Sequence, residues 1–467
     1  MVHCFNNFGE NIVLDINSNA VHIFDALSYD VLNSMYQADF GGWRGSCAST
    51  PAPIELTNKY SEEDIREAIA EINSLISEGV LFSPDLDGEE LLGLGMTHVF
   101  KSLCLHMAHD CNMKCGYCFA SEGNFGMQNE VMDSETARKA VDFIVRASKS
   151  RRNIEVDFFG GEPLLNFDVI REVVSYARTL EPEFNKKFRF TLTTNGLLLD
   201  DKITDYVNEN MDNLVLSLDG RREVNDSMRK LLDDRGSYDA VLSRIKRAVE
   251  RRGGKNYYIR GTYTAMNKDF MEDVLHIADI GFDQISVEPV VAPTNKKLQL
   301  NGPDLEFLKS QYEQLAKECR KRENEGKGFN FFHFMVSLDG GPCLPRRITG
   351  CGAGYEYAAV TPRGDIYPCH QFVGVEGMKI GNVYSGIDIT EITDEFKIAN
   401  VYNKEKCRQC WAKFYCSGGC AANAYATNGS IFEPDSISCE LMKKRIECAI
   451  WLEATRDIAN AGGNLIR

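Results

Sequence analysis

The chain has 467 residues and a formal net charge of −16 at pH 7. This length predicts two to four domains, and the acidic balance argues against nucleic-acid binding, because phosphate contacts require basic surface. The first residues lack a basic stretch followed by an apolar one, and no segment reaches the roughly 18 apolar residues of a membrane span. We therefore expect a soluble cytoplasmic protein that binds neither nucleic acid nor membrane.

Residues 1–90 are expected to form a small separate domain. Apolar and polar residues alternate on both sides of a turn within 12–23, which predicts a hairpin. Ser61 is expected to cap a helix that ends at Gly79, and the apolar run 80–82 predicts a returning strand. Such an order is typical of a winged-helix module. The alternative is an N-terminal extension packed on the next domain.

A polar stretch at 83–90 is the predicted linker to a second domain, 97–320, in which apolar strands alternate with helix-like segments. Repeated βα units predict a parallel sheet closed fully or partly into a barrel, with active-site residues at the C-terminal strand ends. Strands are expected at 154–159, 188–193, 214–218, 258–264 and 284–291, and helices at 134–148 and 167–179, among others.

Three cysteines, Cys111, Cys115 and Cys118, follow one another with the spacing C-x3-C-x2-C. Because the chain shows no secretion signal, its 16 cysteines favour metal or iron-sulfur ligation over disulfides. Three thiolates can hold three irons of a four-iron cluster and leave the fourth free to bind a small molecule, whereas clusters that only carry electrons normally have four thiolates. Zinc is the alternative, since His109 could complete a tetrahedral set.

The triad, with Tyr117 directly before its third cysteine, resembles that of the radical S-adenosylmethionine (SAM) enzymes. The resemblance implies a partial (β/α)6 barrel and a [4Fe-4S] cluster on Cys111, Cys115 and Cys118. It also implies that SAM binds the free iron through its amino and carboxylate groups and is cleaved to a 5′-deoxyadenosyl radical. A low-potential donor, flavodoxin or ferredoxin, would supply the electron.

Short polar motifs follow the predicted strands and complete the expected SAM site. Gly160-Gly161-Glu162-Pro163 looks like the GGEP motif of this superfamily, in which glycines allow close approach and a carboxylate accepts hydrogen bonds from an ammonium group. In the sulfatase-maturase branch, a serine and an arginine twelve residues later contact SAM, and Ser217 and Arg229 match that spacing. The predicted SAM contacts are Tyr117, Gly160, Gly161, Glu162, Asn195, Ser217, Asp219 and Arg229.

Arg260 and Glu288 stand on later predicted strands. Two interpretations are equally open for this pair. The side chains either line the same cavity or form salt bridges within the barrel.

The last region, 321–467, contains a second array of cysteines that resembles the SPASM extension of radical SAM enzymes that modify peptides and proteins. The family pattern assigns a closed outer cluster and an inner cluster nearer the active site, which brings the expected total to three [4Fe-4S] clusters. A structural double-zinc module is the alternative. The outer set comprises Cys407, Cys410, Cys416 and Cys439, and the inner set comprises Cys351, Cys369 and Cys420.

Two positions depart from the sulfatase-maturase pattern. Seven residues separate Cys343 from Cys351 where that pattern has a shorter spacing, so the inner cluster either takes Cys343 as its fourth ligand or stays open to a cysteine of the substrate. His370 stands after Cys369 where sulfatase maturases carry a catalytic aspartate. Histidine could also act as a base near neutral pH, which makes His370 a candidate catalytic residue.

The whole chain resembles maturases of ribosomally made peptides, most closely those of the six-cysteine SCIFF peptides, through the phrases at 103–111 and 349–357. The resemblance implies thioether crosslinks, of the sactipeptide or ranthipeptide kind, between cysteine sulfur and carbon in a Cys-rich precursor peptide. The N-terminal domain would bind its leader as an added strand and tether the substrate. The alternatives are a sulfatase-type maturase that oxidises a cysteine or serine, and a zinc-stabilised peptide-binding scaffold.

Overall fold

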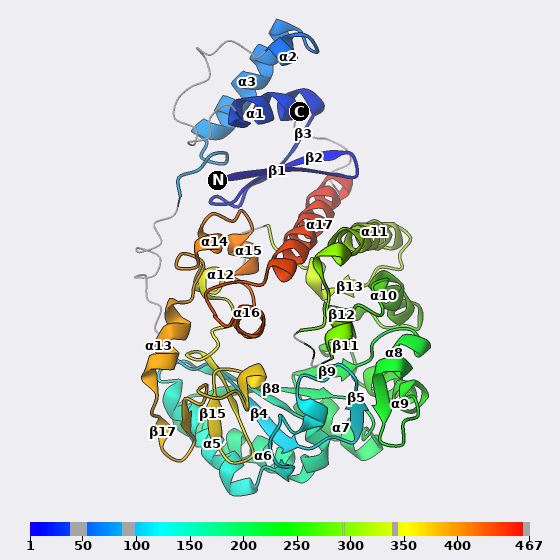
Figure 1. The fold of residues 1–467 in the computed structure, drawn as a ribbon, viewed down its shortest axis with the longest axis vertical. Coiled ribbons are helices and arrows are strands. Elements are labelled where there is room, and N and C mark those ends of the chain that lie inside the picture. The colour runs from blue at the N-terminus through cyan, green and yellow to red at the C-terminus, as the bar shows by residue number, and fades with distance from the viewer. Residues whose placement is uncertain (38–53, 86–98, 292, 294, 339–343, 461–467) are drawn as a thin grey trace.

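The computed structural model describes residues 1–37, 54–85, 99–291, 293, 295–338 and 344–460. Figure 1 shows the N-terminal part at the top, the large sheet with its helices at the bottom, and a cysteine-rich lobe beside the long C-terminal helix between them. Cys47, Cys343 and residues 86–90 of the expected linker lie outside the described residues.

The N-terminal part begins with an antiparallel sheet and continues with helices. The sheet consists of β1 (Val2–Asn7), β2 (Glu10–Asp15) and β3 (Val21–Phe24), and the helices are α1 (Ala26–Gln37), α2 (Ile54–Thr57) and α3 (Glu62–Ser77). The predicted hairpin is confirmed by the pairing of β2 with β3. The predicted helix cap is also confirmed, because Ser61 Oγ accepts a hydrogen bond from the Asp64 N–H at 3.1 Å.

The expected returning strand at 80–82 is wrong. These residues form bends, because the Val80 N–H bonds to the Leu75 carbonyl at the end of α3 and Leu81 is buried beneath the helices. The apolar run therefore closes the helix end through a hydrophobic contact and pairs with no strand. The winged-helix assignment stays a prediction.

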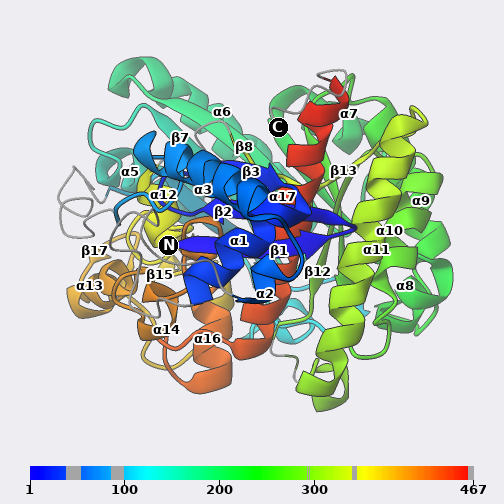
Figure 2. The same ribbon diagram turned by 90° about the horizontal axis from the view of Figure 1, so that it is seen from above.

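Strand β2 joins two cores because its side chains alternate between its faces. Val13 packs against the helices of the N-terminal part, whereas Ile12 and Leu14 belong to the main core of the molecule. Helix α17 (Ser436–Asn460) lies under this second face, as the view from above shows (Figure 2). His3 Nε2 lies 3.0 Å from the Glu447 carboxylate of α17, which adds a polar contact between the N-terminal sheet and this helix.

A 12-stranded mixed sheet is the largest sheet among the described residues. Its centre consists of six strands whose neighbours are parallel, and β13 (Asn330–Phe331) continues them at one end. The five strands predicted for residues 154–291 are confirmed to within two residues at each end. In sheet order the six are β4 (Ser102–His109), β7 (Asn153–Gly160), β8 (Lys187–Thr194), β9 (Asn213–Ser217), β11 (Tyr257–Tyr263) and β12 (Gln284–Pro289).

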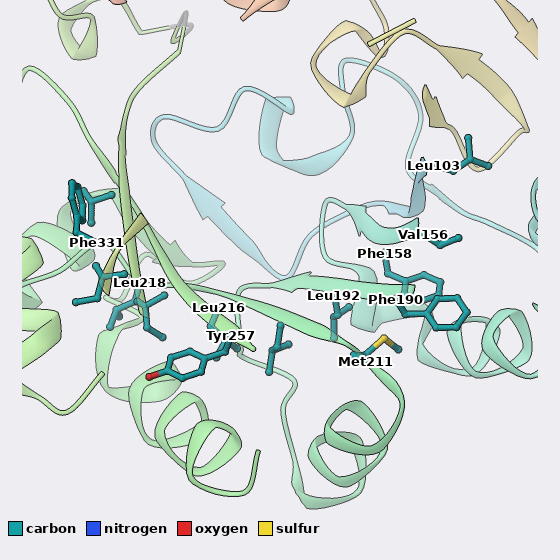
Figure 3. Packing of buried hydrophobic residues seen from close by; sticks show 14 of the residues in the cluster. Leu103, Val156, Phe158, Phe190, Leu192, Met211, Leu216, Leu218, Tyr257 and Phe331 are labelled. Carbon is teal, nitrogen blue, oxygen red and sulfur yellow. The ribbon is translucent and has the colours of Figure 1, made fainter. Parts of the chain in front are cut away.

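Helices cover the outer face of these strands. The two predicted helices are confirmed as α5 (Ser134–Ala147) and α6 (Phe167–Phe184), the second being five residues longer than expected. The others are α7 (Asp201–Asn210), α8 (Arg222–Met228), α9 (Tyr238–Glu250), α10 (Phe270–Asp279) and α11 (Leu305–Asn324). Figure 3 shows the packing between the two layers, where Phe158, Phe190, Leu192 and Leu216 are buried.

Alternation along each strand decides what faces the inside of the curved sheet. In β11, for example, Tyr257, Ile259 and Tyr263 are buried in the core, so Arg260 and Thr262 point to the opposite face. Polar side chains from several strands therefore meet on the inner side.

The cysteine-rich lobe continues the main sheet. β14 (Tyr357–Val360) pairs in parallel with β4, and β15 (Asp365–Tyr367), β16 (Gly381–Asn382) and β17 (Gly386–Ile387) follow in antiparallel order. The expected boundary at 320/321 falls inside α11. Short helices complete the lobe: α12 (Leu344–Thr349), α13 (Thr390–Ile398), α14 (Glu405–Arg408), α15 (Lys413–Cys416) and α16 (Ala421–Asn428).

The chain thus has an α/β fold built on a large mixed sheet whose path is open within the described residues, from β13 to β17. The expected closure as a six-strand partial barrel stays a prediction. Among the described residues, no helix is both long and apolar enough to cross a membrane.

Candidate functional site

The three cysteines of the C-x3-C-x2-C triad line one cavity of about 210 Å³ at the C-terminal ends of the central strands. They lie on the segment after β4, where β5 (Met113–Cys115) pairs with β10 (Arg229–Leu231). This pairing sets Arg229 opposite Cys115. Residues more than one hundred positions apart are thereby joined at one wall of the cavity.

The donor set of this wall fits an iron-sulfur cluster. Burial raises the pKa of the Cys111 thiol to about 12 and that of Cys115 to about 11, and metal binding would offset this cost by displacing the protons. Among the described residues, no three His, Cys, Asp or Glu groups lie close enough to share one metal ion. In a four-iron cluster each thiolate binds a different iron, so the ligands need not converge on one point.

The strand end at 160–162 passes closely beneath this segment. Gly160 has φ +126°, and a Cβ on Gly161 would lie 2.0 Å from the Asp110 carbonyl oxygen, so only glycine fits at these two positions. Glu162 is buried, and its carboxylate accepts hydrogen bonds from Thr194 Oγ1 at 2.7 Å and the Asn195 N–H at 2.9 Å. Burial raises the pKa of Glu162 to about 7, since the described groups that bond it are all neutral.

Tyr117, Asp219 and Arg229 form one buried group at the floor of the cavity. Both Asp219 oxygens lie 2.8 Å from the Tyr117 hydroxyl, and Oδ1 lies 3.0 Å from Arg229 Nε. Tyr117 and Arg229 line the cavity, but Asp219 does not. Asp219 thus hydrogen-bonds two side chains that line the cavity, and its expected contact with SAM stays a prediction.

The remaining expected SAM contacts, Asn195 and Ser217, also line the cavity. Asn195 Nδ2 donates to Asn112 Oδ1 at 2.8 Å, which ties the end of β8 to the cysteine segment. His109, the possible zinc ligand, is buried outside the cavity lining and bonds to His106 at 3.0 Å.

The opposite wall consists of residues from β11, β12 and the cysteine-rich lobe. Arg260 Nη2 lies 3.4 Å from Glu288 Oε1, and both side chains line the cavity. The pair therefore forms a salt bridge within the sheet and also belongs to the cavity wall, as the two interpretations of the sequence proposed. Burial alone would raise the pKa of Glu288, but Arg260, His333 and Arg445 hold it at about 2. Glu288 therefore faces the cavity as a carboxylate.

His370 lies on the same wall. Its Nδ1 is 3.0 Å from the Tyr357 hydroxyl, and the rings of Phe159 and Phe119 stand 5.1 Å and 5.7 Å from its own. Burial lowers the pKa of His370 to about 4. The imidazole is therefore neutral near pH 7.

Several cavity residues carry no motif and were missed by the sequence reasoning. They come from strand ends, from the loop after β12, from the segment that follows Cys118 and from the turn at His370, and only the alternation along the strands could have indicated Phe159 and Thr262. The missed residues include Met113, Phe119, Phe159, Thr262, Val290 and Gln371.

Cysteines within each of the two expected sets lie near one another, and their assignment to two clusters stays a prediction. The Cys369 thiol has its pKa raised by burial first and then by Cys420 and Cys351. Burial likewise raises the pKa of Cys407, Cys416 and Cys439 to about 11. Neighbouring thiols of the outer set, among them Cys410, contribute to this increase in pKa. Cys343 cannot be placed in either set, because it lies outside the described residues.

Two regions of the chain match known protein families. Residues 105–281 match the radical SAM superfamily, and residues 351–411 match the SPASM iron-sulfur cluster-binding domain. The chain therefore contains a radical SAM domain and a SPASM domain. The first match includes the triad and strands β7 to β11, and the second begins at Cys351.

More extended similarity is found to individual proteins. The cysteine-type anaerobic sulfatase-maturating enzyme of Clostridium novyi is 24% identical over 366 residues, which cover 72% of this chain and 92% of that protein. The radical SAM cyclopropyl synthase TigE of Paramaledivibacter caminithermalis is 23% identical over 385 residues, with 76% and 74% covered.

Solved structures share the fold. Native anSMEcpe with bound AdoMet and Cp18Cys peptide has a TM-score of 0.60 at 20% identity and covers 77% of this chain and 99% of its own. Streptococcus suis SuiB bound to precursor peptide SuiA has a TM-score of 0.51 at 17% identity and covers 93% and 98%. The radical SAM α/β fold follows from these matches.

Proposed function

We propose that this protein is a radical SAM maturase that forms thioether crosslinks, between cysteine sulfur and carbon, in a ribosomally made Cys-rich precursor peptide. The observation that carries the proposal is a single cavity with the cysteine triad on one wall and Arg260, Glu288 and His370 on the other. The radical SAM and SPASM domains support it, as do a relative named as a sulfatase-maturating enzyme and a solved structure of similar fold that binds a precursor peptide.

The wall made by β4, β7, β8 and β9 is the proposed cofactor side. Cys111, Cys115 and Cys118 would hold the cluster, and the Glu162 carboxylate would accept hydrogen bonds from the amino group of SAM. Ser217 and Arg229 are proposed to bind the SAM carboxylate. The remaining contacts are assigned to Tyr117, Gly160, Gly161 and Asn195, with Asp219 as the positioning residue.

When bound, the cluster and SAM would supply a 5′-deoxyadenosyl radical that removes a hydrogen atom from a carbon of the peptide. That carbon then bonds to the sulfur of a peptide cysteine, and the thiol proton leaves. Formation of the bond releases one electron, which balances the one electron that cleaves the sulfonium. The acceptor residue is proposed to be one such as threonine.

The opposite wall is the proposed peptide side. Arg260 and Glu288 present a cation and an anion that can bind the carbonyl and N–H groups of a peptide backbone. Because His370 Nδ1 is engaged by Tyr357, its Nε2 is the nitrogen left for the substrate. The wall thus offers polar groups at three points, and these would fix the peptide relative to the radical.

The cysteine-rich lobe is proposed to hold two further [4Fe-4S] clusters, the outer on Cys407, Cys410, Cys416 and Cys439 and the inner on Cys351, Cys369 and Cys420. Cys343 or a substrate thiolate would complete the inner one. The assignments of 1–90, 97–320 and 321–467 as leader-binding, radical SAM and SPASM domains belong to the proposal. So do a flavodoxin or ferredoxin donor and a cytoplasmic location.

A sulfatase-type maturase is the second candidate, favoured by the similarity to the Clostridium novyi protein over most of its length. His370 speaks against it, because sulfatase maturases carry an aspartate at this position. A thioether consumes a thiol without creating a carbonyl. Oxidation of one side chain creates an aldehyde and leaves the other cysteines free.

The test is anaerobic incubation of the full chain with SAM, a reductant and a Cys-rich precursor peptide, followed by fragmentation mass spectrometry. A thioether product loses two hydrogens, leaves one cysteine unreactive toward an alkylating reagent and does not react with a hydrazine probe. A product that reacts with hydrazine supports the sulfatase-type candidate and contradicts the thioether proposal. Its mass is lower by two hydrogens if a serine is oxidised, and it has also exchanged one sulfur for oxygen if a cysteine is oxidised.

A further inference from the structure

Lys404 is a buried cation within the cysteine-rich lobe. Its side chain belongs to a residue that is only 3% exposed, and it stands three positions before Cys407, at the start of α14. Its Nζ donates to the Gly418 carbonyl oxygen at 2.9 Å. No carboxylate of the described residues forms an ion pair with it, in contrast to Lys101, Lys309, Lys443 and Lys444.

The position of Lys404 is between the two cysteine sets. Gly418 lies two residues from Cys416 of the outer set and two from Cys420 of the inner set, and a Cβ on Gly418 would be 3.5 Å from the Lys404 ammonium. The same short loop also lies close to Cys351. A Cβ on Gly350, the residue before Cys351, would lie 3.2 Å from the Ser417 carbonyl oxygen. The cysteines that interact electrostatically with the Lys404 ammonium accordingly come from both sets. They are Cys407, Cys416, Cys420 and Cys351.

A buried ammonium without an anionic partner is unfavourable, because it loses its hydration and gains no compensating charge. A four-iron cluster with thiolate ligands would supply such a charge, because it is an anion whose negative charge increases on reduction. The reduction potential of such a cluster depends on nearby charge and hydrogen bonds. Lys404 is placed to meet two such anions at once.

We propose that Lys404 is the shared counter-charge of the inner and outer auxiliary clusters and makes both of them easier to reduce. The inference rests on the proposed function, since it requires that both cysteine sets hold clusters. A cation near an anionic centre stabilises the reduced state more than the oxidised state, because the reduced state carries one more negative charge. Both clusters would then be better acceptors for the electron released when the sulfur–carbon bond forms.

Lys443 provides a matched comparison on the same lobe. Its ammonium acts on Cys410 and Cys439 of the outer set only, and Glu440 lies 2.9 Å from it. The adjacent carboxylate cancels most of the field of this lysine. Lys443 should therefore affect one cluster, and weakly.

The experiment compares Lys404→Met, Lys404→Arg and Lys443→Met with the unchanged full chain, each reconstituted anaerobically with iron and sulfide. Midpoint potentials are measured by electron paramagnetic resonance during a redox titration, with the cluster on Cys111, Cys115 and Cys118 as the internal reference. We expect Lys404→Met to shift both auxiliary potentials to more negative values and Lys404→Arg to restore them. Lys443→Met should give a smaller shift, confined to the outer cluster. Unchanged auxiliary potentials in loaded Lys404→Met protein overturn the inference, as does an equal shift in Lys443→Met.

Iron content decides the case in which Lys404→Met does not retain its auxiliary clusters. Retention by Lys404→Arg together with loss by Lys404→Met and Lys404→Gln supports the inference, because both neutral variants lack the charge that Arg retains, and Gln still has a hydrogen-bond donor. Loss of the auxiliary clusters in all three variants overturns the inference, since a variant that keeps the positive charge then behaves like the two that lack it. If the unchanged chain itself holds no auxiliary clusters, the proposed function fails as well. If it holds them and crosslinks its peptide while the potentials do not move, only the inference fails.

Discussion

The two walls of the cavity are built in different ways. On the proposed cofactor side, the residues stand in short motifs, such as Gly160 to Glu162, in which the glycine backbone passes too close to its neighbours for any side chain. On the proposed peptide side, Arg260, Glu288 and His370 come from three separate segments and line the cavity with their side chains. The comparison suggests that the motif wall serves a ligand of constant chemistry, whereas the other wall can change with the substrate.

We expect the largest effect from removing one cysteine of the triad, which belongs to the wall built from short motifs. Cys115→Ala should abolish release of 5′-deoxyadenosine and lower the iron content by about four per chain, because the remaining two thiolates do not hold a four-iron cluster stably. Colorimetric iron analysis and chromatography of the nucleoside check this. Cys448→Ala is the control and should retain all the iron, since Cys448 is buried and the cysteine that acts on its thiol is Cys319, which belongs to neither the triad nor the two sets. Continued nucleoside release by Cys115→Ala would contradict the assignment of the triad.

Asp219→Asn tests whether this carboxylate acts through its neighbours. It removes the partner of the buried Arg229, so we expect a loss of stability of about 3–5 kcal/mol and an increase of about 100-fold in the KM for SAM. Chemical denaturation and the SAM dependence of nucleoside release measure the two effects. Asp269→Asn is a matched control at an exposed pair with Arg221 and should cost about 1 kcal/mol or less. Unchanged SAM affinity would mean that Arg229 needs no positioning.

Glu288→Gln tests whether the wall that contains Glu288 binds the peptide and leaves SAM cleavage to the other wall. It removes an anion of the peptide wall without touching the motif wall, so the KM for the peptide should rise about tenfold while SAM cleavage without peptide continues. The measurement is the ratio of 5′-deoxyadenosine to crosslinked peptide, which should rise. Arg322→Gln, at a pair with Asp279 remote from the cavity, is the control and should leave the ratio unchanged. A loss of SAM cleavage equal to the loss of crosslinking would place Glu288 on the cofactor side.

Tyr357→Phe should give the smallest effect. It removes only the hydroxyl that holds His370 Nδ1, an interaction of about 1 kcal/mol, so crosslinking should slow by a factor of about five. Single-turnover measurements with saturating peptide are the test, with Tyr384→Phe as a control whose partner is the distant Thr136. No change in rate would show that the orientation of His370 is set by the rings of Phe119 and Phe159 alone.

The sequence alone allowed much of this molecule to be predicted. Strand periodicity located the central parallel strands, and the order of the cysteines grouped residues that lie near one another in the structure. The glycines at 160 and 161 were identifiable as positions of close approach. These features depend on local backbone geometry and on spacing along the chain, which a sequence displays directly.

Tertiary structure decided the rest, because it depends on which distant residues share a space. It placed Asp219 beneath Tyr117 and Arg229, turned the apolar run 80–82 into a helix closure, and carried the main sheet across the expected boundary at 320/321. It also enclosed Lys404 between two sets of thiols. A pattern along the chain shows which residues are apolar, charged or sulfur-bearing. Only packing determines which of them lack a partner and which face the same cavity.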